Sequence, residues 1–216
     1  MSSKNLPPEH SAVKENEKEK NKAQPHAQTQ VNAWVEDLTE TPLSSEVHYR
    51  GIITTIRKDK AQHPSGKIVD REVVEHPGGV VAYPVLDDGR VVLVQQWRYP
   101  IGKTLLELPA GKLDWHHGKA EDPLKAIQRE LLEETGYQAK HWEAITSIYT
   151  APGFCDEKLW LFKASGLFNG HKAKQPSEQE WLNVVCLPPE ALMDQIKTGQ
   201  IQDAKTIALA ALLCSQ

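Results

Sequence analysis

The sequence predicts an α+β fold, built as an αβα sandwich around a mixed β-sheet. Two observations carry this prediction. Strand-like runs rich in Val, Ile and Thr dominate residues 47–97, and the segments with helical start and stop signals are few and separate from them. Strands combined with two or three segregated helices are typical of this fold class.

Length and composition bound the class of protein. The chain has 216 residues, a net charge of −4 and 39% hydrophobic residues, which suits one domain with a sizeable core. No apolar run approaches the ~18 residues of a membrane span, and no Lys/Arg block predicts binding to nucleic acid or to a membrane surface. The three cysteines have no CxxC spacing and favour neither a disulfide scaffold nor a zinc site, so we expect a cytoplasmic protein.

We expect the chain to divide into three parts. Residues 1–30 contain nine Lys or Glu and no aromatic residue, so they form a disordered polar tail, and they show no secretory signal. Residues 31–78 form an N-terminal strand region, and residues 79–216 form the main domain.

Strands are predicted from β-branched and aromatic runs bounded by turn residues. The first strand pattern covers Val47–Lys58, and His63–Gly66 supplies a turn before the next strand at Lys67–Glu75. Val80–Leu86 and Val91–Trp97 flank an Asp-Asp-Gly sequence, which is a strong hairpin signal. Further strands are expected at Trp142–Thr150, Lys158–Ala164 and Trp181–Leu187.

The helix predicted over residues 123–135 has the clearest boundaries. Asp122 is a natural N-cap, Pro123 suits the first helical position, and Gly136 suits the residue after the end. The core-facing stripe consists of Leu124, Ile127 and Leu131. Two further helices are expected at about Pro189–Thr198 and Ala204–Leu213.

Three carboxylates gather on the 123–135 helix. Glu130, Glu133 and Glu134 lie at i, i+3 and i+4 and cover a sector of roughly 100° beside the apolar stripe. Like charges this close repel one another, and Arg129 offsets part of the repulsion by pairing with Glu133. The remaining charge suits a hard cation such as Mg²⁺ or Mn²⁺. Taken alone, the same pattern is more typical of a solvated acidic helix face.

The residues around this helix resemble the Nudix box, G-x5-E-x7-R-E-U-x-E-E-x-G-U. Gly111, Glu121 and the run Arg129–Tyr137 carry the resemblance. The chain departs from the pattern twice: nine residues separate Gly111 from Glu121 instead of five, and Tyr137 stands where an aliphatic residue is usual. Because the extra residues fall in a loop, where length is tolerated, we expect the carboxylate geometry to survive.

The resemblance implies a Nudix fold and a role for each residue of the box. Glu130 and Glu134 are expected to bind Mg²⁺ directly, and the carbonyl of Ala110 to complete the coordination. Glu133 is a further ligand or a partner of the ligands. The residues with structural roles are Gly111, Glu121, Arg129 and Gly136.

Four segments outside the box are similar to the ADP-ribose pyrophosphatase branch of the family, and the similarity covers residues from about 45 to 213. These segments are REVVEHPG at 71–78, QQWRYP at 95–100, LELPAGK at 106–112 and TAPGFCDE at 150–157. In that branch an N-terminal sheet is exchanged between two protomers. The resemblance therefore implies a small N-terminal antiparallel sheet and a homodimer, with Trp34 or Tyr49 as a candidate to stack on the base.

Substrate contacts are assigned on the same resemblance. Arg98 and Arg71 are candidates for the diphosphate or ribose, because a guanidinium matches phosphate oxygens; surface salt bridges are their alternative role. Glu107 accepts hydrogen bonds from the ribose or base, or else has a structural role. Pro152 and Phe154 form a wall for the sugar or adenine, or else pack in the core.

An acidic pair, Glu178 and Glu180, precedes the last predicted strand. In the resembling branch such a loop reaches the metal site. Glu178 takes the position of the base that activates water, and Glu180 that of an additional metal ligand, although the sequence leaves open which of the two is the base.

The resulting expectation is an enzyme that uses Mg²⁺, or Mn²⁺, to cleave ADP-ribose into AMP and ribose 5-phosphate. One alternative is hydrolysis of another nucleoside diphosphate sugar, such as GDP-mannose. Another is a Nudix-fold sensor that binds nucleotides without hydrolysing them, although such proteins typically lose carboxylates that are present here. The expected partners are this small substrate and a second copy of the chain, with no nucleic acid or membrane.

Glu178→Gln is expected to lower turnover by orders of magnitude with little change in substrate affinity, because the amide cannot accept a proton from the attacking water. Steady-state kinetics of the variant and the wild type measure both quantities. Near-normal turnover would remove Glu178 from the mechanism.

Overall fold

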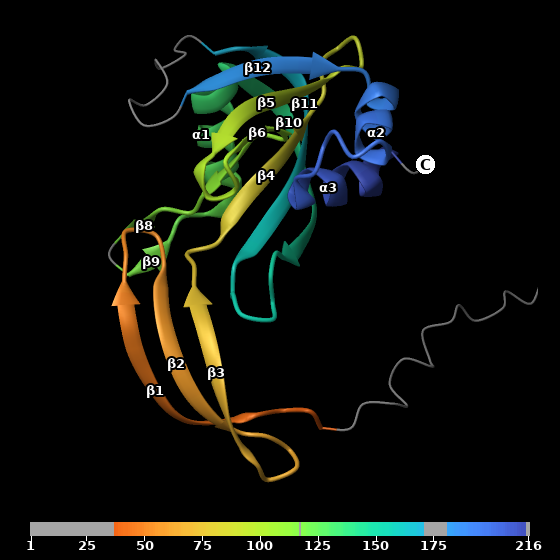
Figure 1. The fold of residues 1–216 in the computed structure, drawn as a ribbon. Coiled ribbons are helices and arrows are strands. Elements are labelled where there is room, and N and C mark those ends of the chain that lie inside the picture. The colour runs from red at the N-terminus through yellow and green to blue at the C-terminus, as the bar shows by residue number, and fades with distance from the viewer. Residues whose placement is uncertain (1–36, 117, 171–180, 215–216) are drawn as a thin grey trace, which may run out of the picture. The chain divides into compact units, whose positions relative to one another are not determined.

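The computed structural model describes residues 37–116, 118–170 and 181–214 of the chain (Figure 1). The chain divides into two units, Met1–Leu38 and Thr39–Gln216, and all described helices and strands belong to the second. The helices are α1 (Pro123–Thr135), α2 (Pro189–Lys197) and α3 (Ala204–Cys214), with a 3-10 turn η2 (Tyr99–Ile101). The strands are β1 (Thr41–Arg50), β2 (Thr55–Gln62), β3 (Ile68–Glu75), β4 (Gly79–Pro84), β5 (Val91–Arg98), β6 (Lys103–Glu107), β7 (Ala110–Lys112), β8 (Trp115–His116), β9 (Lys119–Ala120), β10 (Tyr137–Tyr149), β11 (Lys158–Asn169) and β12 (Leu182–Leu187).

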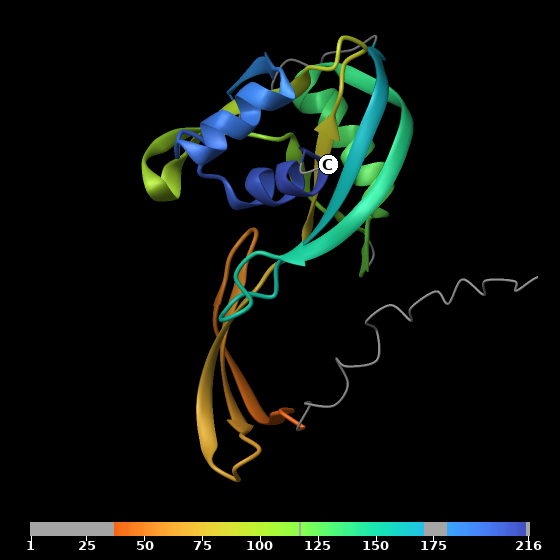
Figure 2. The ribbon, with the colours of Figure 1, turned by 90° about the vertical axis from the view of Figure 1, so that its right-hand side faces the viewer.

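Two sheets build the main body. The four-stranded sheet has the order β10-β11-β4-β7 and is mixed, because β11 runs parallel to β4 while the other pairs are antiparallel. The three-stranded sheet has the order β12-β5-β6 and is antiparallel. Figure 2 shows β10 and β11 as a long curved pair, with α2 and α3 next to each other. The predicted α+β class with a mixed sheet is confirmed.

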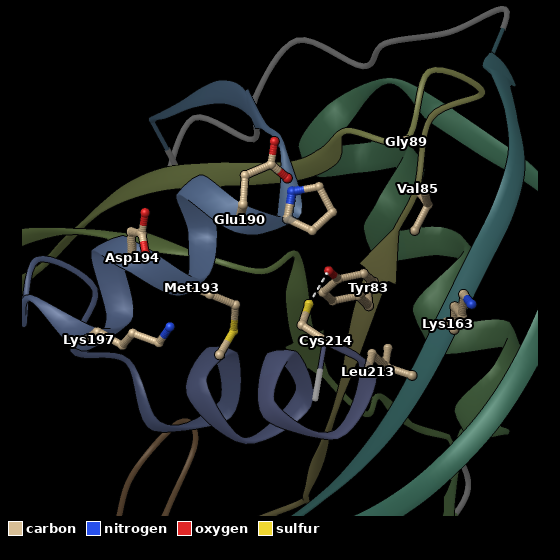
Figure 3. Close-up of a pocket in the computed structure, with 11 residues that line it drawn as sticks. Tyr83, Val85, Gly89, Lys163, Glu190, Met193, Asp194, Lys197, Leu213 and Cys214 are labelled. Atoms are coloured by element: carbon tan, nitrogen blue, oxygen red, sulfur yellow. Dashed lines mark hydrogen bonds between the residues drawn. The ribbon is translucent and has the colours of Figure 1, made fainter. Parts of the chain in front are cut away.

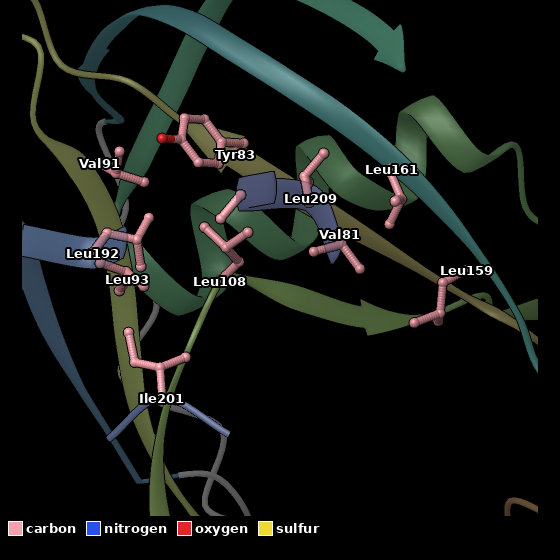
Figure 4. Close-up of a cluster of buried hydrophobic side chains, with 11 residues drawn as sticks. Val81, Tyr83, Val91, Leu93, Leu108, Leu159, Leu161, Leu192, Ile201 and Leu209 are labelled. Atoms are coloured by element: carbon pink, nitrogen blue, oxygen red, sulfur yellow. The ribbon is translucent and has the colours of Figure 1, made fainter. Parts of the chain in front are cut away.

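Strand β4 separates two hydrophobic clusters, because alternate side chains of a strand point to opposite faces. Val80 and Ala82 pack with Ala126 and Ile127 of α1. Val81 and Tyr83 belong to the second cluster, which joins β5 and β11 to α2 and α3 (Figure 4). That cluster also contains Val91, Leu93, Leu108, Leu159, Leu161, Leu192, Ile201, Leu209 and Ala210. The mixed sheet is thus covered on both faces.

A separate antiparallel sheet, β1-β2-β3, precedes the main body in the chain. The single strand pattern predicted over Val47–Lys58 is wrong, since the chain turns back between β1 and β2. The Gly51 N–H donates to the Thr54 carbonyl at 2.8 Å, and Ile52 between them is fully exposed. Because the turn contains apolar β-branched residues, the sequence pattern resembled that of one continuous strand.

The predicted hairpin between β4 and β5 is only half right. Its turn is present, with the Leu86 N–H donating to the Arg90 carbonyl at 2.9 Å. The two strands then enter different sheets, and a single bridge between Val85 and Val91 joins them. β4 is buried along its whole length and β5 over residues 91–94, so the strands diverge to serve two sheets rather than pairing with each other.

The helices lie where the sequence predicts them. Asp122 caps α1 by accepting a hydrogen bond from the Lys125 N–H at 3.1 Å, and Gly136 ends the helix with φ of 74°. The extra residues of the box form a small hairpin, β8-β9, before α1. None of the helices in the described ranges has the length and apolar character that crossing a bilayer demands. The expected tail over residues 1–30 lies outside the described residues, and the division at residue 78 stays a prediction.

Asp122→Ala is expected to destabilise the protein by about 1 kcal/mol, because it removes the acceptor for the Lys125 N–H at the start of α1. Urea unfolding followed by circular dichroism measures the change. Asp122→Asn keeps a capping oxygen and is the matched control, which should stay within a few tenths of a kcal/mol of the wild type. An equal loss in both variants would contradict the capping role.

Candidate active site

The acidic helix α1 faces the loop that leads into strand β7. Glu134 accepts a hydrogen bond from the Ala110 N–H at 3.0 Å through its Oε2 atom. Glu130, one helical turn earlier, lies against the next residue of the loop, Gly111. Two of the predicted ligand side chains therefore converge on the short Ala110–Gly111 backbone.

Gly111 is required by this close approach. A Cβ atom on Gly111 would lie 1.9 Å from the carboxylate carbon of Glu130 and 2.0 Å from its Oε1 atom. No side chain fits at such distances, so the glycine holds open the space that the carboxylate occupies. The glycine of the motif is thus explained by the side chain of Glu130, 19 residues later, rather than by its own backbone angles.

Arg129 lies among the carboxylates and links them. It donates to Glu121 at 3.0 Å, to Glu130 at 2.8 Å and to Glu133 at 3.2 Å. Burial alone would lower the pKa of Arg129, but the hydrogen bonds to Glu121 and Glu130 outweigh it and raise the pKa. The guanidinium stays charged and reduces the repulsion among the acidic groups. The sequence predicted only the pairing of Arg129 with Glu133.

The donor set at α1 fits a hard divalent cation. Glu130 and Glu134 offer carboxylate oxygens, and the adjoining backbone offers a carbonyl, which are the ligands that Mg²⁺ and Mn²⁺ prefer. No group of three or more His, Cys, Asp or Glu side chains within 37–116, 118–170 and 181–214 is arranged to hold a metal ion. Glu178 and Glu180, expected to complete the acidic set, lie outside these residues.

A second charged group joins β5, β6 and α3. Arg98 donates to both oxygens of Glu107, from Nε and Nη2, at 2.7 Å each. Lys205 of α3 donates to the same carboxylate and to Asp203 at 2.9 Å. Burial alone would raise the pKa of Glu107, but the Arg98 hydrogen bond and the charge of Lys205 outweigh it and lower the pKa. Glu107 is 1% exposed, a placement that favours its structural interpretation over a substrate contact.

Sequence reasoning missed the contribution of α3 to this region. Asp203 accepts hydrogen bonds from the Thr206 N–H at 3.0 Å and from its hydroxyl at 2.6 Å, so it caps the helix. The Thr206 hydroxyl in turn accepts from the Leu108 N–H at 2.8 Å. An Asp directly before the predicted helix was a usable N-cap signal, but nothing in the sequence paired Lys205 with a residue 98 positions away.

Three predicted substrate contacts line a common cavity of about 520 Å³ between the small sheet and the 152–156 loop. These are Arg71, Pro152 and Phe154, and Phe154 is 58% exposed. Arg71 forms a salt bridge with Glu40, which raises the pKa of Arg71. Asp59 also lines the cavity, and its buried Oδ1 has no hydrogen-bond partner among the described residues. The cavity therefore offers a cation and an aromatic face.

The predicted site residues thus form three groups in the described structure. The first group is the box carboxylates with Arg129. The second is the pair Arg98 and Glu107. The third is Arg71 with the proline and phenylalanine that line its cavity. Neither Arg98 nor a box carboxylate lines that cavity. Trp34 lies outside the described residues, and Tyr49 is 58% exposed on β1.

A further hollow of about 720 Å³ lies between α2, α3 and β4 (Figure 3). Tyr83 and Cys214 meet at its wall, with 2.9 Å between the hydroxyl oxygen and Sγ. Burial and this contact raise the pKa of Tyr83. Two lysines and two acidic residues also line it: Lys163, Lys197, Glu190 and Asp194. No predicted site residue belongs to this hollow.

Residues 75–210 match the family model described as NUDIX domain, which covers more than half of the chain. The chain belongs to the Nudix family. The match contains the acidic helix, the Ala110–Gly111 loop and the Lys205 contact described above.

This Nudix chain matches three named relatives over most of the length of each relative. ADP-ribose pyrophosphatase of Bacillus subtilis (strain 168) is 36% identical over 80% of this chain and 91% of the relative. Methanol dehydrogenase activator of Bacillus methanolicus is 35% identical over 78% and 89%. GDP-mannose pyrophosphatase of Cronobacter sakazakii (strain ATCC BAA-894) is 31% identical over 65% and 78%.

A solved structure described as "Crystal structure of ADP compounds hydrolase" superposes with a TM-score of 0.71. It covers 84% of this chain and 96% of its own, with 21% sequence identity. At that identity the likeness establishes the Nudix fold alone.

Gly111→Ala is expected to destabilise the protein by about 1–3 kcal/mol, because the new methyl group overlaps the Glu130 carboxylate and forces it aside. Thermal and urea unfolding measure the loss. Gly153→Ala is the matched control, since a Cβ atom there meets nothing within 4 Å, and it should leave stability unchanged. Equal stability of the two variants would mean that Gly111 and Glu130 do not make this contact.

Proposed function

We propose that the chain hydrolyses the pyrophosphate linkage of ADP-ribose, with Mg²⁺, to give AMP and ribose 5-phosphate. The observation that carries the proposal is the convergence of Glu130 and Glu134 on the Ala110–Gly111 backbone. This arrangement supplies hard oxygen ligands beside a loop, which suits a cation bound to a diphosphate. Relatives named ADP-ribose pyrophosphatase, at 36% identity, support the choice of substrate.

Two alternatives are weaker. Relatives named GDP-mannose pyrophosphatase keep another nucleoside diphosphate sugar as the second candidate, at lower identity and coverage than the ADP-ribose relatives. A sensor that binds without hydrolysing would not need the acidic set, yet all four carboxylates are present. Arg129 links Glu121, Glu130 and Glu133. Glu134 binds the Ala110 N–H.

Each residue of the box has its own proposed role in the reaction. When bound, Mg²⁺ neutralises phosphate oxygens and lowers the pKa of a coordinated water. The cation would be held by Glu130, Glu134 and the Ala110 carbonyl. Glu133 would be a further ligand or a partner of these ligands. Arg129 fixes the carboxylates through the hydrogen bonds described above. Glu178 is the proposed base for the attacking water and Glu180 a further ligand; both stay predictions.

Substrate binding uses the other two groups of residues. Arg98 holds the diphosphate, since its side chain is 38% exposed and its guanidinium sits at the end of β5. The cavity with Arg71, Pro152 and Phe154 takes the nucleoside or the sugar, because it combines a cation with exposed apolar surface. Glu107 acts by holding Arg98 rather than by touching the substrate.

The chain is further proposed to act as a homodimer. The small sheet exposes large apolar side chains, including Leu43, Val47 and Tyr49, which is unusual for a surface in permanent contact with water. A second copy of the chain is the proposed cover, with Tyr49 as the aromatic that stacks on the base. A cytoplasmic location also stays a prediction.

A substrate panel tests the proposal. ADP-ribose, GDP-mannose, UDP-glucose, NADH and a diadenosine polyphosphate are incubated with protein and Mg²⁺, and released phosphomonoester is measured. ADP-ribose is expected to give the highest kcat/KM, and chelator is expected to abolish the activity until Mg²⁺ is restored. A preference for GDP-mannose would select the second candidate, and activity indifferent to chelator would overturn the metal-dependent mechanism.

Glu130→Gln is expected to lower kcat by at least about 100-fold, since residues that merely orient metal ligands already cost 10–100-fold. Glu143→Gln on β10 is the matched control, because that carboxylate is exposed and lies outside the Nudix box. Steady-state kinetics at saturating Mg²⁺ compare the two. Similar rates in both variants would exclude Glu130 from the metal site.

A further inference from the structure

Lys205 lies outside the Nudix box and the four segments similar to the ADP-ribose pyrophosphatase branch, yet its side chain reaches the buried Glu107. It sits in the first turn of α3, and its side chain is only 12% exposed. Its ammonium group donates to Glu107 on β6 and to Asp203 at the start of its own helix. A lysine is rarely buried without a specific partner, so its position calls for an explanation.

Glu107, the carboxylate that Lys205 shares with Arg98, fixes the position of the Arg98 guanidinium. Glu107 receives Nε and Nη2 of Arg98, and its Oε2 atom also receives Lys205. The bidentate contact uses one edge of the guanidinium. Within the described residues, Nη1 makes no hydrogen bond to another side chain or to the backbone, and the Arg98 side chain is 38% exposed.

Lys205 gives the buried Glu107 carboxylate a second cationic partner. Arg98 and Lys205 carry one positive charge each, and Glu107 and Asp203 carry one negative charge each, so the four groups together have no net charge. The contribution of Lys205 is therefore geometric: it fixes the carboxylate that Arg98 contacts. Asp203 accepts from Lys205 through Oδ1 and from Thr206 through Oδ2, so it ties the lysine to the start of α3.

We propose that Lys205 is a positioning residue for diphosphate binding: it shares Glu107 with Arg98, holds the guanidinium at the end of β5, and leaves Nη1 to contact a phosphate oxygen. The inference rests on the proposed function, because it assigns Lys205 to the binding of the same nucleoside diphosphate sugar. It adds a helix that carries none of the family motifs to the substrate-binding machinery.

The first test compares Lys205→Met with Lys205→Arg and the wild type. Lys205→Met is expected to raise KM for ADP-ribose, and the Kd for ADP, roughly tenfold or more, because small displacements of a binding group cost this much. The kcat value is expected to stay within about twofold. Lys205→Arg keeps the charge and should restore both constants to within about threefold. Calorimetry gives the Kd, and phosphomonoester release gives the kinetic constants.

A double-mutant cycle tests whether Lys205 acts through Glu107. Glu107→Gln removes the shared carboxylate, so adding Lys205→Met to it is expected to change KM by less than about twofold. If the two effects simply multiply, Lys205 acts independently and the proposal is overturned. Should Lys205→Met fail to fold, Lys205→Gln, which keeps a donor but loses the charge, is expected to show the same rise in KM.

Loss of stability is separated from loss of positioning by a control on the same helix. Leu209→Val weakens the packing of the fully buried Leu209 against the core and is expected to lower the Tm while leaving KM unchanged. A rise of KM in Leu209→Val equal to that in Lys205→Met would mean that any weakening of α3 has this effect, and would overturn the proposal.

The outcomes also separate this inference from the proposed function. If the wild type cleaves ADP-ribose but Lys205→Met keeps its KM and Kd, the inference fails and the function stands. If the wild type does not cleave ADP-ribose but Lys205→Met binds ADP more weakly than the wild type, the function fails and the inference stands. If the wild type neither binds ADP nor cleaves the substrate, both fall.

Discussion

The contact between the acidic helix and the loop before it is the constraint on which the site depends. Glu130 occupies the space beside Gly111, and Glu134 binds the Ala110 amide, so α1 cannot move relative to β7 without breaking both contacts. The same approach brings the carboxylates of both glutamates to one stretch of backbone. Repulsion among these acids is limited because Arg129 bonds three of the neighbouring carboxylates.

The rest of the fold maintains this contact. β7 pairs with β4, whose two faces carry the two hydrophobic clusters, and one of those clusters contains the buried face of α1. The segment before the loop is fixed from the other side, where Thr206 accepts from the Leu108 N–H. The loop is therefore held between α1 and α3, and each helix is anchored in a different cluster.

Local signals in the sequence were sufficient for what is local in the structure. Asp122 and Gly136 mark the ends of α1 correctly, and the box spacing places its carboxylates on one face. The sequence did not show which strands and side chains pair over longer distances along the chain. The Asp-Asp-Gly turn is real, but its strands join different sheets, and Ile52 belongs to a turn although it is β-branched. The ion pair between Lys205 and Glu107 depends on tertiary packing, which no spacing rule records.

The distance in sequence between the loop and α3 has a consequence for protein synthesis. All residues of the Nudix box leave the ribosome well before Ala204–Cys214, because chains emerge from their N-terminus onward. A nascent chain that has completed α1 still lacks the hydroxyl that fixes the Leu108 amide and the lysine that shares Glu107. The loop therefore cannot reach its final geometry until Ala204–Cys214 has been synthesised.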